Sequence, residues 1–190
     1  MPSVFCTRSS SWANPYGAEL TISRLEGAKR QLDTAIRLWL DAGDPLAIHT
    51  LTMAAYGVLN DLLKHENVDL HSRLDELLTA VGRQRFRRLA NMLKHADRDP
   101  EAPLSLPTDE ENESRIGLAV TLYRNLASDM TREMRALDTM FKLAYPKFFQ
   151  IDLTSAPVLK RELQIYSTHL PNDIELRRDL VRVQLNQGSN

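Results

Sequence analysis

Apolar residues recur alternately four and three positions apart over a long stretch of the chain, and this spacing constrains the fold more than any other sequence feature. A repeat of 3.5 residues keeps one apolar seam of a helix facing its packing partners along the whole length. The seam comprises Ile116, Val120, Tyr123, Ala127, Met130, Met134, Leu137, Phe141 and Ala144.

Both ends of this helix are marked in the sequence. Thr108 and Glu111 have the spacing of a capping box, and Pro146 cannot continue a helix. The pattern therefore predicts one helix of about 37 residues, roughly 55 Å long. Because this length exceeds the usual width of a four-helix domain, we expect the helix either to break internally or to meet a second subunit.

Helical periodicity also covers most of the remaining chain. Gly43 ends the first helix, Asp44 offers an N-cap carboxylate to the second, and Pro45 occupies its first position. We expect Gly82 to bend the third helix, residues 65–71 to form a loop, and the proline-containing residues 99–107 to form a connector. The predicted helices span residues 19–43, 45–64, 72–96, 108–146, 158–166 and 173–185.

The fold class follows from these patterns. The sequence shows no alternating strand pattern, and its seven glycines in 190 residues disfavour a turn-rich β fold. We therefore predict an all-α protein, an antiparallel helical bundle of four main helices plus two shorter C-terminal helices. Residues 1–16 are expected to be a flexible arm, 17–146 the bundle, and 147–190 a helical extension packed on the bundle or on a partner.

Composition narrows the possible functions. The chain has 24 Lys and Arg against 25 Asp and Glu, so any basic binding site must be local. The single cysteine, Cys6, excludes an internal disulfide and favours a reducing compartment. Neither a signal peptide nor an apolar run of membrane-spanning length is apparent. We expect a cytoplasmic protein with no membrane contact.

The strongest local charge concentration lies late in the third predicted helix. On a helical wheel, Arg88, Asn91 and His95 fall within about 60° of one another, opposite an apolar stripe. Arg presents a permanently charged fork to phosphate oxygens, and His exchanges a proton near neutral pH, which suits metal-independent RNA cleavage. The basic residues of this stretch are Arg83, Arg85, Arg87, Arg88, Lys94 and Arg98.

The spacing of Arg88, six residues and His95 resembles the signature of HEPN domains, an Arg followed after four to six residues by a His. Members of this superfamily are helical bundles, often dimeric. Many are metal-independent ribonucleases of toxin–antitoxin or other defence systems, and relatives without the active pair serve as binding or scaffolding domains. The resemblance implies that Arg88 stabilises the scissile phosphate and that His95 is the acid or base, with two such pairs meeting across a dimer groove. The predicted RNA contacts are Arg85, Arg87, Asn91 and Lys94. The predicted supporting residues are Asp97 and His49, which the helical pattern places on the polar edge of the 45–64 helix.

Other chemistries have less support. A metal site built from His49, His95 and Asp61 or Asp97 is disfavoured, because neither helix holds two ligands at the spacing of His-Glu-x-x-His. Helix-turn-helix DNA readout is disfavoured because the basic residues encircle their helix. Motifs of classical hydrolases, nucleotide triphosphatases and dinucleotide enzymes are missing from the sequence. We expect neither a metal nor a cofactor.

A second class of function stays open. In this alternative the protein is a noncatalytic interaction or scaffold protein, and its 116–144 helix binds a protein partner or a second copy of the chain. Methionine side chains adapt to different partners, although the same residues also suit an ordinary core. A homodimer is expected under both interpretations. The side chains considered for this contact are Met130, Met134, Met140 and Phe141.

Overall fold

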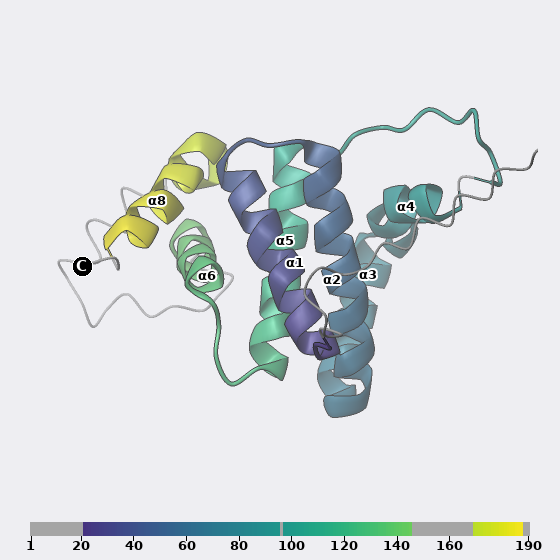
Figure 1. Ribbon diagram of the computed structural model, residues 1–190, viewed down its shortest axis with the longest axis horizontal. Coiled ribbons are helices and arrows are strands. Elements are labelled where there is room, and N and C mark those ends of the chain that lie inside the picture. The colour runs from purple at the N-terminus through teal and green to yellow at the C-terminus, as the bar shows by residue number, and fades with distance from the viewer. Residues whose placement is uncertain (1–20, 96, 146–168, 188–190) are drawn as a thin grey trace, which may run out of the picture.

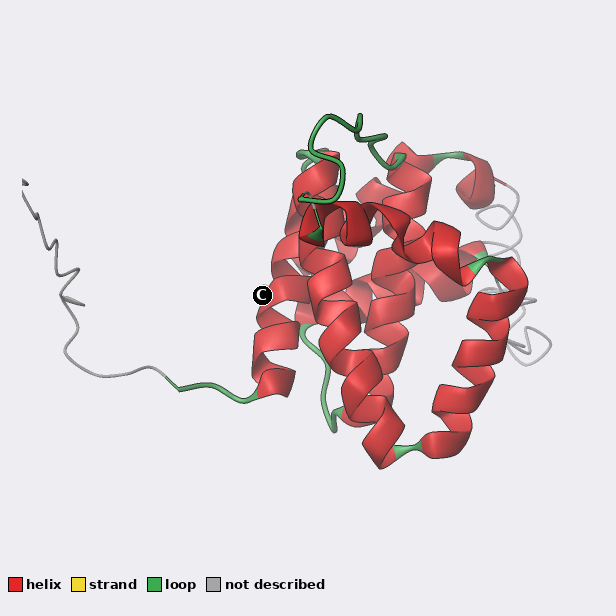
Figure 2. Cartoon of the chain, turned by 90° about the vertical axis from the view of Figure 1, so that its right-hand side faces the viewer, coloured by secondary structure: helices red, strands yellow, loops and turns green. Residues whose placement is uncertain are grey.

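The computed structural model describes residues 21–95, 97–145 and 169–187, and these residues form helices and connecting loops with no strand. The prediction of an all-α fold is confirmed (Figure 2). The predicted arm, residues 1–16, and the predicted helix 158–166 lie outside the described residues. The helices are α1 (Arg24–Leu40), α2 (Pro45–Glu66), α3 (Val68–Val81), α4 (Arg83–Lys94), α5 (Asp109–Leu126), α6 (Arg132–Ala144), the 3-10 helix η1 (Leu170–Asn172) and α8 (Ile174–Gln187).

Helices α1, α2 and α5 pack on one another at the centre of the fold (Figure 1). Helices α6 and α8 lie on one side of this centre, and α3 and α4 lie on the other side. Trp39, Leu59, Ile116 and Leu137 are fully buried and belong to one continuous apolar core. Burial of such large side chains supplies the main favourable term for a helical fold of this size.

The predicted helix starts are confirmed where they depend on local capping chemistry. The Asp44 carboxylate accepts a hydrogen bond from the Ala47 amide at 2.7 Å, with Pro45 at the first position of α2. Thr108 and Glu111 form both hydrogen bonds of a capping box at the start of α5. The start of α8 differs from the expected one: Asn172 and Glu175 have capping-box spacing in the sequence, but the carboxylate that accepts from the Leu176 amide, at 2.9 Å, belongs to Asp173.

The long helix predicted over residues 108–146 breaks internally, which is one of the two outcomes expected for it. Helix α5 ends at Leu126, and α6 begins after Thr131, whose hydroxyl accepts from the Met134 amide and donates to Asp33 at 2.6 Å. The hydrogen bond to α1 fixes the new helix start against the core. Met134 and Met140 on α6 are fully buried, so residues 116–144 present no continuous methionine-rich face.

The loop predicted at residues 65–71 is wrong. Helix α2 continues to Glu66, and Asn67 alone joins it to α3, its side chain accepting from the Leu70 amide at 3.0 Å. The bend predicted at Gly82 is a complete break between α3 and α4. Gly82 has a φ of +94°, a backbone conformation that residues with a side chain rarely adopt.

The C-terminal helix α8 is held on the bundle by a buried ion pair. The Arg177 guanidinium donates to both carboxylate oxygens of Glu113 on α5 at 2.6 Å, and also to the Leu170 carbonyl at 2.6 Å. The next residue, Arg178, lies over the ring of Trp39 with its guanidinium carbon 5.3 Å from the ring centre. The described part of the C-terminal extension therefore packs on α6 and α1 and is joined to α5 by the Arg177–Glu113 pair.

Of the described helices, only α2 is long and apolar enough to cross a bilayer, judged by length and composition alone. Its apolar side chains pack against α1 and α5 at the centre of the fold. Central core helices commonly meet the same criterion.

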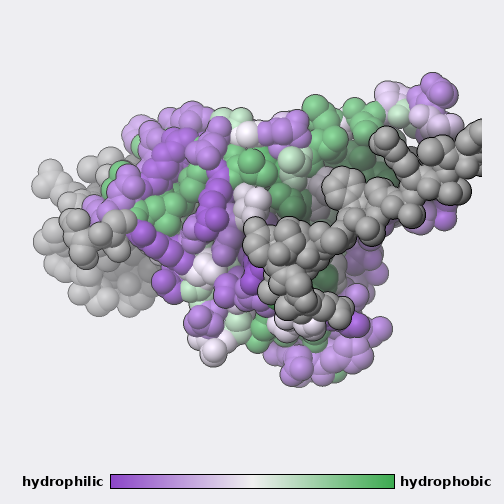
Figure 3. All heavy atoms as spheres, in the orientation of Figure 1, coloured by the Kyte–Doolittle hydropathy of each residue, from purple (hydrophilic) through white to green (hydrophobic). Residues whose placement is uncertain are grey.

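The surface is uneven in polarity. Hydrophobic atoms are exposed along its upper edge, toward the connector between α4 and α5 (Figure 3). In that connector Leu104 and Leu106 are 42% and 56% exposed. An apolar rim therefore lies close to the end of α4.

A close contact between α5 and α6 gives a first testable prediction. A Cβ atom added at Gly117 would lie 2.6 Å from ring carbons of Phe141. We expect Gly117→Ala to lower the free energy of unfolding by about 1–2 kcal/mol, because overpacking outweighs the gain in helix propensity. Urea denaturation checks this loss, and Phe141→Leu should restore part of it. A Gly117→Ala variant more stable than the parent would contradict the contact.

Candidate nucleic-acid interface

Helix α4 crosses α2 on one side of the bundle and carries the candidate site (Figure 2). Leu89 is buried, and the Phe86 ring makes an edge contact with the Tyr56 ring at 5.1 Å between centroids. Because the apolar stripe of α4 faces inward, its opposite side is left to solvent. The predicted exposure of Arg88, Asn91 and His95 is confirmed.

Several cations on this side have no acidic partner. Within the described part of the chain, no carboxylate lies within 4.0 Å of a charged nitrogen of Arg88, Lys94 or Arg98. Their charge is therefore available to an anion. We call Arg88, Asn91, Lys94, His95 and Arg98 the α4 cationic face.

The other arginines of the stretch are engaged with the protein to different degrees. Arg83 contacts Asp75 at 2.5 Å and donates to the Thr79 hydroxyl, so it joins α4 to α3. Arg85 is 3.9 Å from Glu111, a loose and exposed pair. Arg87 lies over the Tyr56 ring at 5.9 Å. Arg85 and Arg87, both predicted RNA contacts, therefore make only these loose contacts with acidic and aromatic side chains of the described residues.

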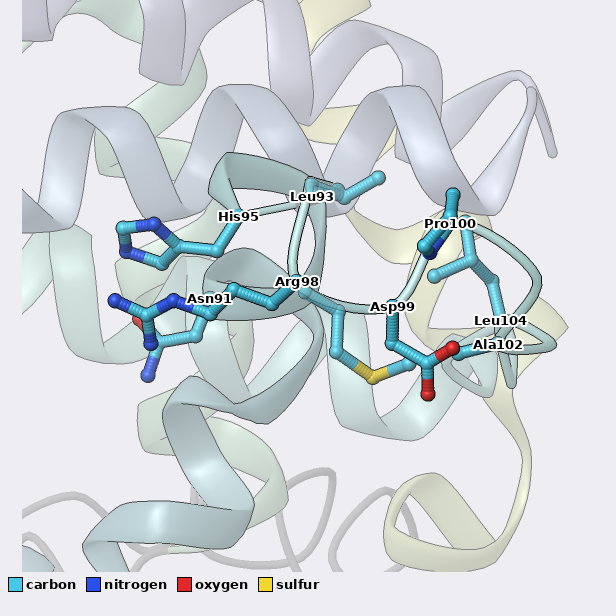
Figure 4. Close-up of a pocket in the computed structure, with 9 residues that line it drawn as sticks. Asn91, Leu93, His95, Arg98, Asp99, Pro100, Ala102 and Leu104 are labelled. Atoms are coloured by element: carbon cyan, nitrogen blue, oxygen red, sulfur yellow. The ribbon is translucent and has the colours of Figure 1, made fainter.

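His95 caps the C-terminus of α4, its amide donating to the Asn91 carbonyl at 3.0 Å. It lines a surface cavity of about 380 Å³ together with Asn91 and Arg98. Figure 4 shows the side chains of Asn91, His95 and Arg98 pointing to the same side of the chain. Arg98, which was not among the predicted site residues, is thus the cation that shares a cavity with the imidazole.

Arg88 lies on the same helix side, two turns before His95. Seven residues at 1.5 Å per residue separate them by about 10 Å along the helix axis. Arg88 does not line the cavity that contains His95. The structure therefore places the two residues of the HEPN-like pair on one exposed surface, without a direct contact between them.

A second cavity of about 500 Å³ lies between α2 and α4. It brings together Arg87, Asn91 and Lys94, three of the four predicted RNA contacts. Asn91 also lines the cavity around His95, so the two cavities adjoin. We call this second cavity the α2–α4 groove. The residues of α2 that line it are Thr50, Met53, Ala54, Tyr56, Gly57, Asn60 and Asp61.

The prediction that His49 lies on the polar edge of α2 is wrong. His49 is fully buried, and neither ring nitrogen has a hydrogen-bond partner among the described residues. Burial and the nearby positive charge of Arg115 lower its pKa from 6.5 to about 4. It therefore belongs to the core facing α5 and does not support the α4 cationic face. Asp97 is exposed and lines neither cavity.

The described residues include no group of three His, Cys, Asp or Glu side chains that could hold a metal ion. The groups of the α4 cationic face that could act on a ligand are its cations, Arg88, Lys94 and Arg98, and the His95 imidazole. Comparisons with protein-family models, curated proteins and solved structures find no significant match.

Proposed function

We propose that the protein binds RNA through the α4 cationic face. The observation that carries this proposal is a set of three cations, Arg88, Lys94 and Arg98, that have no acidic partner among the described residues. They lie near His95 and two adjoining cavities. Lys and Arg that neutralise phosphates release condensed counterions, and this release drives binding to the backbone of a nucleic acid. Such a local site suits a chain with a net charge of −1.

The proposal extends to a HEPN-like protein with a metal-independent ribonuclease activity. In this arrangement the helices form an antiparallel four-main-helix bundle with C-terminal helices, and two copies pair as a homodimer. A cytoplasmic defence or toxin–antitoxin module is the setting that the resemblance implies. Arg98 and the His95 imidazole line one exposed cavity, and this arrangement supports the proposed chemistry. Arg88 is the arginine of the HEPN-like pair.

Cleavage would proceed through the ribose of the RNA itself. His95 accepts the proton of a 2′-hydroxyl, whose oxygen attacks the adjacent phosphorus. The bond from phosphorus to the 5′ oxygen breaks, and this oxygen takes a proton from water or from the second imidazole of a dimer. The products are a 2′,3′-cyclic phosphate and a 5′-hydroxyl. Arg98 and Arg88 would stabilise the negative charge that develops on the phosphate oxygens.

The interaction-protein alternative draws less support from the structure. Two of its four proposed contact residues, Met134 and Met140, are fully buried in the core of the same chain. The 116–144 helix expected to make this contact is interrupted at residues 127–131.

The activity is tested by incubating labelled single-stranded RNA with purified protein in the presence of a chelator. We expect cleavage to 2′,3′-cyclic phosphate ends, and we expect His95→Ala and Arg88→Ala each to reduce the rate at least a hundredfold. His65→Ala, which changes an exposed histidine of α2, is the matched control and should cleave like the parent. Unchanged cleavage by both site variants would overturn the assignment.

A further inference from the structure

The α2–α4 groove contains two side chains that binding of an RNA backbone does not explain. Asn60 and Asp61 lie on α2, across the groove from Arg87 and Lys94. A carboxylate repels phosphate, so Asp61 weakens a site that attracts only the backbone. Its presence points to a ligand with hydrogen-bond donors on the α2 side and negative charge on the α4 side.

Asp61 is free to accept such donors. Its side chain is exposed, and no described Lys, Arg or His nitrogen lies within 4.0 Å of its carboxylate, although Lys94 and Arg87 line the same groove. A carboxylate accepts two parallel hydrogen bonds when a flat partner offers two adjacent donors.

Asn60 is oriented by its neighbours. The Tyr56 hydroxyl donates to Asn60 Oδ1 at 3.5 Å, and Tyr56 is itself held by Phe86 and Arg87. Because the amide oxygen is engaged by Tyr56, the amide nitrogen is the end of Asn60 left to donate to a ligand. Asn60 and Asp61 therefore place one donor and one acceptor beside each other.

The groove has room for a base. Its volume of about 500 Å³ falls within the range of small-molecule sites. Gly57 lies in the α2 wall, and a Cβ built on it meets no atom within 4 Å. The glycine thus leaves open space beside Asn60 and Asp61, where a flat ring can lie against the helix.

Guanine matches this arrangement better than the other RNA bases. Its Watson–Crick edge carries two adjacent donors, N1–H and the N2 amino group, next to the acceptor O6. Uracil offers one donor between two acceptors, adenine and cytosine offer one amino group beside an acceptor, and none of these offers two adjacent donors. We infer that the α2–α4 groove binds an unpaired guanine of the RNA, with Asp61 on the two donors, Asn60 on O6, and Arg87 and Lys94 on the flanking phosphates.

This inference rests on the proposed function, and its test separates the two. The probe is a fluorescein-labelled U12 strand, compared by anisotropy with strands that carry one central G, A or inosine. We expect the G strand to bind about tenfold more tightly than U12, and inosine, which lacks the N2 amino group, to lose most of this preference. Asp61→Asn should bring the G strand close to U12 while leaving U12 binding unchanged or stronger.

Two further variants complete the design. Gly57→Leu starts from a Cβ that meets no atom within 4 Å, and its side chain fills the groove, so it should remove the preference for G. Asp129→Asn changes an exposed carboxylate between α5 and α6 and should retain the preference. Equal affinity of the parent for the G and U strands would overturn the guanine inference and leave RNA binding intact. Failure to bind any strand would overturn the proposed function and the inference together.

Discussion

Replacing Arg177 with leucine is expected to lower the free energy of unfolding by about 3–5 kcal/mol. The Arg177 and Glu113 side chains are 2% and 4% exposed and share two hydrogen bonds of 2.6 Å. Loss of the guanidinium leaves the Glu113 carboxylate buried without its counter-charge, and it also frees the Leu170 carbonyl. Both losses fall on the contact that fixes α8 to α5.

Urea denaturation of single and double variants measures this effect. Arg30→Ala is the control, because Arg30 is 65% exposed in its pair with Glu26 and its loss should cost less than about 1 kcal/mol. The double variant Glu113→Leu/Arg177→Leu should recover most of the stability, since no unpaired charge remains. If Arg177→Leu costs no more than the control, α8 does not dock on α5 through this pair.

Lowering the pH from 7.5 to 5 is expected to destabilise the protein through His49. Its pKa is about 4 in the fold against 6.5 for an exposed histidine, because burial and Arg115 disfavour the imidazolium. Between these two values the unfolded chain binds a proton that the folded chain does not, so stability falls as the pH falls. The loss amounts to roughly 3 kcal/mol in total, with about 2 kcal/mol of it reached at pH 5.

The charged groups that act on His49 are Arg115, which disfavours its protonation, and Glu111, which favours it. The His49→Leu variant removes the titrating ring while keeping the site apolar. It should lose about 2 kcal/mol less than the parent between pH 7.5 and pH 5, measured by urea denaturation in matched buffers. Parallel pH profiles for parent and variant would contradict the burial of a neutral imidazole here.

The part of the fold that depends on short-range chemistry was predictable from sequence. The N-cap at Asp44 and the capping box at Thr108 both need only residues three positions apart. The position of the break before α6 was harder to predict from sequence, because Thr131 is fixed by Asp33, a residue 98 positions away. Periodicity continues across the break, since α5 and α6 both contribute to the same core.

In the candidate site, too, features set by nearby residues were predictable and features set by distant residues were not. The wheel correctly predicted the exposed side of α4, because its apolar stripe is unambiguous. Arg98 was missed since it follows the helix end, where wheel geometry no longer applies. His49 was misplaced because its burial depends on α5, which packs against α2 but lies far from it in sequence.

The affinity of the protein for single-stranded RNA, measured as a function of salt, shows whether the α4 cationic face binds phosphates. If the α4 cationic face binds phosphates, the triple variant Arg88→Ala/Lys94→Ala/Arg98→Ala should bind at least tenfold more weakly than the parent. Its slope of log K against log salt should be shallower by about two, at roughly 0.7 per lost contact. A control that removes Arg24, Lys64 and Arg73, exposed cations on α1, α2 and α3, should match the parent. Equal losses in the two triple variants, or a parent that binds no RNA at low salt, would contradict the account.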